Sequence, residues 1–120
     1  MAIQEPTARD LRQSIRIERR GVASNSGYGS KAGAWAVLIA QRSAKLLPKL
    51  GGEEVQAQRT TGVVPWECWV RSDSETRLIK PKDKVVDRRT GEEFNITFAR
   101  DMTGRGRWIL LQLTSGGALG

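Results

Sequence analysis

The chain has 120 residues and carries a net charge of +7, from 20 basic and 13 acidic side chains. This length suits one domain, and no apolar run approaches the ~20 residues that a membrane-spanning helix needs. We therefore expect no membrane association, and the polar N-terminus lacks the apolar centre of a signal peptide. Cys68 is the only cysteine, which excludes an internal disulfide and indicates synthesis in a reducing cytoplasm.

The basic excess is uneven along the chain. Residues 21–52 contain four basic side chains and no acidic one. Such a stretch is typical of a surface near a polyanion, and equally of an ordinary solvated surface. Both interpretations stay open on composition alone.

Residues 1–10 are predicted to form a flexible N-terminal arm. The alternation of Ile15 and Ile17 with polar side chains then predicts a strand over residues 12–20. The density of arginine in this strand admits three interpretations: contact with nucleic acid, protection of a strand edge, or a surface for another protein. The arginines concerned are Arg12, Arg16, Arg19 and Arg20.

Glycine and serine predict a long loop over residues 21–33, followed by a strand from Ala34 to Pro48 with a bend or bulge on the way. Residues 51–59 are predicted to form at most one or two helical turns, with two glutamates at the positive end of the dipole.

Further strands are predicted over residues 64–71, 85–87, 94–100 and 108–114, before a flexible tail at 116–120. The pattern predicts an all-β fold: a small antiparallel barrel or sandwich of about six strands, with long loops and at most one short helix. The predicted core comprises Ile15, Ile17, Trp35, Val37, Cys68, Val70, Phe94, Ile96, Phe98, Trp108 and Leu110.

Catalytic chemistry is missing from the sequence. There is no histidine, which removes the usual general base and the commonest metal ligand, and one cysteine cannot build a zinc site. Adjacent glutamates on a strand face opposite ways, so a cap and a hairpin explain them better than acid–base catalysis. We expect neither an enzyme nor a cofactor.

The four tryptophans suggest either base stacking or core packing. Three of them lie on the apolar face of a strand or open an apolar run, which favours the core. Trp69 is the exception, because it alternates with Cys68 and Val70. We expect a loop or a partner subunit to cover it.

The order of several motifs resembles the head–tail joining proteins of tailed bacteriophages, also called head completion or stopper proteins. "LRQSIRIERR" is followed by a glycine loop and Trp35, then by "AKLLPKLGGEEVQAQ", a strand ending in Arg71, "GEEFNI" and "GRGRWILLQL". The similarity spans residues 11–115, which we take as one domain.

The resemblance implies a β-barrel subunit of the virion neck, made in the cytoplasm of a bacterial host. It implies a ring of about six or twelve copies beneath the portal or adaptor and above a tail terminator or tail tube. The ring would retain packaged double-stranded DNA and offer a docking surface to the tail. No cofactor belongs to this family.

The resemblance also implies where the functional residues lie. The connection after the second strand would face the channel and its DNA; its candidate residues are Lys45, Lys49, Gly51, Gly52 and Arg59. Contacts between subunits would use Arg12, Arg16, Arg19, Arg20, Glu53, Glu54 and Trp69.

Three alternatives stay open. A tail terminator or an adaptor of the same connector would also be small and ring-forming. A free-standing nucleic-acid-binding module of the OB or SH3-like kind would need exposed aromatic side chains among bases on one sheet face. The particle itself could be a phage or a domesticated relative such as a gene transfer agent.

Overall fold

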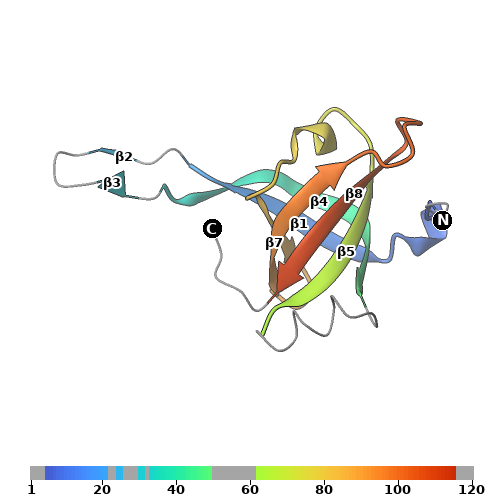
Figure 1. The fold of residues 1–120 in the computed structure, drawn as a ribbon, viewed down its shortest axis with the longest axis horizontal. Helices are drawn as coiled ribbons and strands as arrows, with labels where there is room; N and C mark the ends of the chain where they lie inside the picture. Colours follow the sequence, from blue (N-terminus) through green and yellow to red (C-terminus); the bar gives the residue numbers. More distant parts are fainter. Residues whose placement is uncertain (1–4, 22–23, 26–29, 32, 50–61, 116–120) are drawn as a thin grey trace.

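The structure, a computed structural model, describes residues 5–21, 24–25, 30–31, 33–49 and 62–115. Six antiparallel strands close into a barrel in the order β1-β4-β5-β8-β7-β6 (Figure 1). This confirms the predicted all-β class and the number of barrel strands. The barrel strands are β1 (Gln13–Arg20), β4 (Trp35–Pro48), β5 (Val64–Arg71), β6 (Lys84–Asp87), β7 (Glu93–Arg100) and β8 (Trp108–Ser115).

Helical structure in the described part of the chain is limited to two 3-10 turns. η1 (Ala8–Asp10) precedes β1, and η2 (Thr76–Leu78) lies in the segment between β5 and β6. The helical turn predicted at 51–59 lies outside the described residues. No described helix is long and apolar enough to span a membrane.

Alternation along the strands builds the barrel core, because every second side chain points inward. Six of the predicted core residues are at most 2% exposed, and Phe94 contacts Trp66 edge-on with ring centroids 5.0 Å apart. These confirmed core residues are Ile15, Ile17, Cys68, Val70, Phe94 and Ile96.

The predicted face of β8 was wrong. Ile109, Leu111 and Leu113 point into the core, whereas Trp108 and Leu110 are buried in a separate cluster. The reason is that β8 is apolar on both faces, so alternation cannot tell which set points inward.

Three other core assignments were also wrong. Val37 is 57% exposed and Trp35 half-buried, because the first part of β4 extends beyond the barrel and Ile39 is its first core residue. Phe98 is half-buried, since the register of β7 against β8 shifts between Ile96 and Phe98 and turns the later side chains.

β1 and β4 continue past the barrel as a two-stranded ribbon, which projects to the left in Figure 1. Arg20 pairs with Trp35, and Gly21 N donates to Ala34 O at 2.8 Å. The ribbon ends in the pair β2 (Ser24–Asn25) and β3 (Ser30–Lys31). A Cβ at Gly33 would lie 2.3 Å from Gly21 O, so the two strands can approach here only at glycine.

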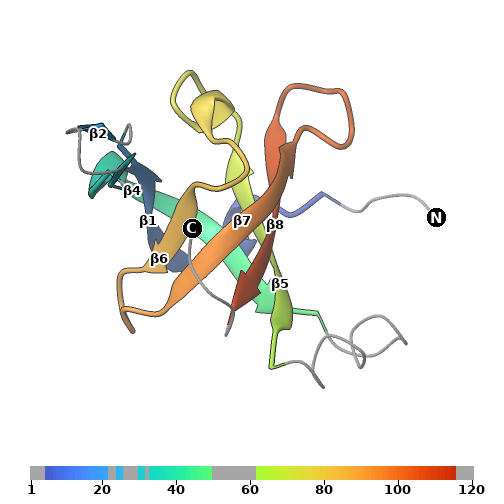
Figure 2. The ribbon, with the colours of Figure 1, turned by 60° about the vertical axis from the view of Figure 1, so that its left-hand side comes forward.

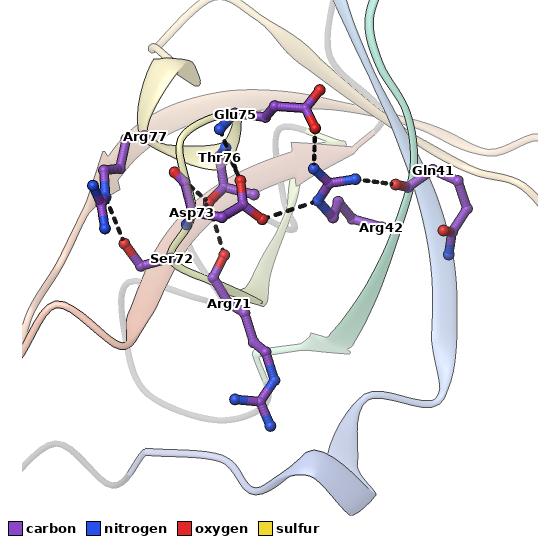
Figure 3. Close-up of polar contacts among 8 residues, drawn as sticks. All are labelled: Gln41, Arg42, Arg71, Ser72, Asp73, Glu75, Thr76 and Arg77. Atoms are coloured by element: carbon purple, nitrogen blue, oxygen red, sulfur yellow. Dashed lines mark hydrogen bonds and ion pairs between the residues drawn. The ribbon is translucent and has the colours of Figure 1, made fainter.

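A clamp centred on Arg42 of β4 fixes the segment between β5 and β6 (Figure 3). Arg42 Nε donates to Asp73 Oδ2 at 3.1 Å, and its Nη2 donates to Glu75. Asp73 Oδ1 accepts from the backbone N–H groups of Glu75 and Thr76, each at 2.8 Å. The buried Thr76 hydroxyl donates to Arg71 O at 2.7 Å, which joins the turn to the end of β5.

The clamp also sets the protonation of Asp73. Partial burial raises the pKa of this carboxyl, but hydrogen bonds from the Thr76 backbone, Arg42 and the Glu75 backbone outweigh that effect. The net result is a pKa below its usual value of 3.8. The carboxylate form therefore stabilises the fold above that pH.

We expect Ile96→Ala to lower the free energy of unfolding by about 2–5 kcal/mol, because it leaves a cavity in a closed core. Val37→Ala should change it by less than about 0.5 kcal/mol, since that side chain is largely solvated. Urea unfolding followed by tryptophan fluorescence measures both. Equal costs for the two substitutions would contradict the assigned faces.

We expect acid to weaken the Arg42 clamp. A lowered pKa in the folded state means that the stabilisation by Asp73 is present above 3.8 and is lost as pH falls through the folded-state value. Asp73→Asn should therefore reduce the loss of stability between neutral and acidic pH. Urea midpoints of both proteins across this range measure it, and parallel curves would exclude the clamp as a contributor.

Candidate functional site

The arginines of β1 are engaged within their own subunit. Arg16 Nε donates to Glu18 Oε2 at 2.6 Å, and Lys84 Nζ lies 3.4 Å from Glu18 Oε1 and also contacts Glu93. Burial raises the pKa of Glu18, but the hydrogen bond from Arg16 and the charge of Lys84 outweigh that effect and bring the pKa below its usual value. The four side chains form a continuous charged row on the outer face of β1, β6 and β7.

Arg19 ties the segment before β6 to β1. Its Nε and Nη2 donate to the two carboxylate oxygens of Asp83, both at 2.9 Å, and Nη2 also donates to Leu78 O at 2.6 Å. The hydrogen bond that Arg19 donates to Asp83 raises the pKa of Arg19. This forked geometry needs a planar guanidinium, so a lysine would not replace it.

Arg20 and Lys84 both lie against the indole of Trp35. The Arg20 guanidinium carbon is 5.1 Å from the ring centroid, and Lys84 Nζ is 4.5 Å from it. Two cations on one indole hold the base of the ribbon against β6. Arg12, by contrast, is exposed and its Nε donates to Arg9 O at 3.4 Å.

Trp69 is covered by the chain's own N-terminal segment. It is 5% exposed and packs with Trp108 and Leu110 on the outside of the barrel, with Leu11 over them. The ion pairs of Glu5 with Arg105 and Arg107, at 3.4 and 3.7 Å, hold the start of this segment against the β7–β8 connection. Residues 5–11, which include the described part of the predicted arm, thus act as a strap.

Of the residues predicted to face the channel, Lys45 and Lys49 are described. Lys45 pairs with Trp69 across β4 and β5 and lines a cavity of about 590 Å³ together with Asp10 and Glu67. Lys49 donates its backbone N–H to Pro65 O at 3.0 Å, and its Nζ lies 3.9 Å from Glu67 Oε1. Lys49 follows the last residue of β4, whereas Lys45 lies four positions earlier, within the ladder between β4 and β5.

The remaining predicted residues lie outside the described residues. They are Gly51, Gly52 and Arg59 of the channel-facing set, and Glu53 and Glu54 of the subunit-interface set. The ends of their connection are described: it leaves β4 at Lys49 and returns at Gly62, just before β5.

Reactive groups are not gathered into a catalytic or metal site in the described part of the chain. No group of three or more histidine, cysteine, aspartate or glutamate side chains is placed to hold a metal ion there. Burial raises the pKa of the Cys68 thiol to about 12, so it is neutral and shielded.

The sequence interpretation missed the Arg42 clamp and assigned no role to Lys80 and Lys82, two basic residues of the segment between β5 and β6. Asp73 followed by Thr76 is a spacing typical of a turn closed by side-chain hydrogen bonds, which was the available signal. Nothing in the spacing names Arg42 as their partner, because it lies 31 positions away from Asp73.

Comparisons with solved structures show the same fold. A protein from the virion of a native gene transfer agent particle has a TM-score of 0.60 at 14% identity, over 90% of this chain and 96% of that one. Protein SF1141 from Shigella flexneri 2a, solved in solution, has a TM-score of 0.58 at 19% identity, over 92% and 96%. No curated protein of similar sequence is found.

A family model supplies the assignment that the fold alone does not. The model described as phage head completion protein matches residues 6–116, which include all six barrel strands and most of the strap. The match bears out the resemblance seen in the order of motifs. The chain belongs to the phage head completion protein family.

Proposed function

We propose that this chain is a subunit of the connector between the head and the tail of a phage-type particle. The observation that carries the proposal is the family match over residues 6–116. It is supported by the fold shared with a protein of a gene transfer agent virion. Family membership makes the chain a structural component of a virion; its position in the neck is the finer part of the proposal.

The proposed subunit assembles as a ring beneath the portal or adaptor and above the tail terminator or tail tube. A closed barrel suits this role because its own strands are paired all round, which leaves the ribbon, the strap and the connections for contacts. Arg12 is the most available of the proposed interface arginines, and we propose that it meets Glu53 or Glu54 of the next copy. Trp69 would join such a contact only where the strap moves aside.

The proposed ring retains packaged DNA through the connection between β4 and β5. Lys49 places positive charge where this connection starts, Lys45 lies four positions earlier in β4, and Arg59 adds a further base before the connection ends. Bases near phosphates attract DNA without reading its sequence. Gly51 and Gly52 widen the conformations that the connection can adopt in a channel.

Particles assembled without the subunit should contain filled or recently emptied heads and separate tails. The expected cause is loss of both the DNA seal and the docking surface. Electron microscopy and a nuclease-protection assay on lysates measure it, with complementation by the intact chain as control. Normal, infectious, tailed particles in its absence would exclude the proposed role.

Shortening residues 50–58 to a tight turn should leave the barrel folded but let packaged DNA leak before tails attach. The barrel strands end before this connection and resume after it, so their pairing is kept. Circular dichroism checks the fold, and the DNA content of tailless heads checks retention. Arg89→Gln, in the β6–β7 turn, is the control. Full DNA retention with the shortened connection would show that another segment closes the channel.

A further inference from the structure

A small cavity lies where the ribbon begins, at the end of the ladder between β1 and β6. β6 pairs with β1 only as far as Glu18 and Lys84, while β1 continues to Arg20. Figure 2 shows β6 beside β1, with the chain that leads into β6 turning away from the ribbon. The opening has a volume of about 260 Å³ and is lined by residues of β1, Trp35 of β4 and residues 80–83.

The cavity has a strong excess of positive charge. Arg19, Arg20, Lys80 and Lys82 line it, against the single carboxylate of Asp83. That carboxylate is already occupied, because it accepts two hydrogen bonds from Arg19 and one from the Lys80 backbone N–H at 2.9 Å. Within the described chain, the ammonium groups of Lys80 and Lys82 have no ion pair.

The backbone at the rim of the cavity is strained at Lys82. Lys82 has a φ of 79°, and it is the only residue other than glycine with a positive φ in the described part of the chain. Its N–H donates to Ile96 O at 2.9 Å, which holds this conformation. Glycine or asparagine would fit with less strain, and strained positions of this kind gather at binding sites.

The surroundings favour an acidic polypeptide over DNA. Trp35 lines the cavity, and Val37, 57% exposed, lies further along the same strand. An apolar side chain beside a cationic pocket suits an acidic segment that also carries apolar residues.

The described residues of a second copy of this chain offer little to fill the pocket. Among the described residues, every carboxylate except that of Glu92 has a hydrogen bond or ion pair within its own subunit. Glu92 itself lies in a turn with Arg88 and Arg89, which would be repelled by the pocket.

We propose that the cationic pocket formed by Arg19, Arg20, Trp35, Lys80 and Lys82 binds an acidic segment of a different protein of the particle. This inference rests on the proposed function for its partner, a neighbouring protein of the virion. The segment places a carboxylate between Lys80 and Lys82 and an apolar side chain towards Val37.

A zero-length carbodiimide cross-link on purified particles tests the contact directly. The reagent joins a lysine amine to a carboxylate that touches it, forming an amide while the reagent takes up water as a urea. Lys84 and Glu93 are in contact within the subunit, so their link reports that the reaction worked. We expect mass spectrometry to find Lys80 or Lys82 joined to an aspartate or glutamate of another virion protein.

A binding assay on the isolated subunit tests the pocket independently of the particle. The probes are short poly-L-glutamate and a short DNA duplex. The shift of the backbone amide resonance of Trp35 measures the binding of each. Lys80→Gln/Lys82→Gln should weaken poly-L-glutamate binding about tenfold, while Arg9→Gln/Arg89→Gln, which removes the same charge at the other end of β1, should change it less than about twofold.

Three results would overturn the inference. They are cross-links from Lys80 or Lys82 only to other copies of this chain, both lysines unlinked in particles that contain the subunit, and equal weakening by the two double variants. Tighter binding of the duplex than of poly-L-glutamate at Trp35 would assign the pocket to DNA instead. If particles lack the subunit altogether, the proposed function fails, and the binding assay still decides the chemistry of the pocket.

Discussion

Closure of the barrel depends on β6, a strand of four residues that pairs with β1 on one side and β7 on the other. All four of its side chains are buried, and two of them, Lys84 and Asp87, are charged. Buried charge is tolerated only when it is paired, and Lys84 has Glu18 and Glu93 while Asp87 accepts from the Arg89 backbone at 2.9 Å. The short closing strand is therefore held by electrostatics as well as by its ladder.

The segment that leads into β6 is positioned by two arginines, one from β4 and one from β1. Arg42 of β4 binds its first part through Asp73, and Arg19 of β1 binds its last part through Asp83. Both contacts join residues more than 30 positions apart, so they form only once the strands are in register. They connect barrel closure to the geometry of the cationic pocket.

The sequence was sufficient for the fold class and for the strands whose two faces differ in polarity. Ile15 and Ile17, or Phe94 and Ile96, alternate with polar residues, and their inward positions follow from that alone. Alternation did not identify the inward-facing residues of β8, because both of its faces are apolar and the strap covers the outer one. The assignment of Val37 to the core was wrong for another reason. Alternation shows which side chains share a face, but it does not show where a strand extends beyond the barrel.

The candidate site was less predictable than the fold. Arginine on β1 was apparent, but which arginines have partners within the subunit depends on contacts such as Arg19 with Asp83, 64 positions apart. Lys80 and Lys82 carried no pattern of their own, and only the end of the β1–β6 ladder reveals that they border an opening.

The ribbon has a consequence for the subunit before it enters a particle. In the described chain, β4 from Trp35 to Ser43 is paired on one side only, with β1. An apolar edge of this kind can template pairing between free copies. The net charge of +7 keeps copies apart, and that repulsion is screened over about 8 Å at physiological ionic strength. Colloidal stability of the unassembled protein should therefore decline as salt is raised, with the ribbon as the first point of self-association.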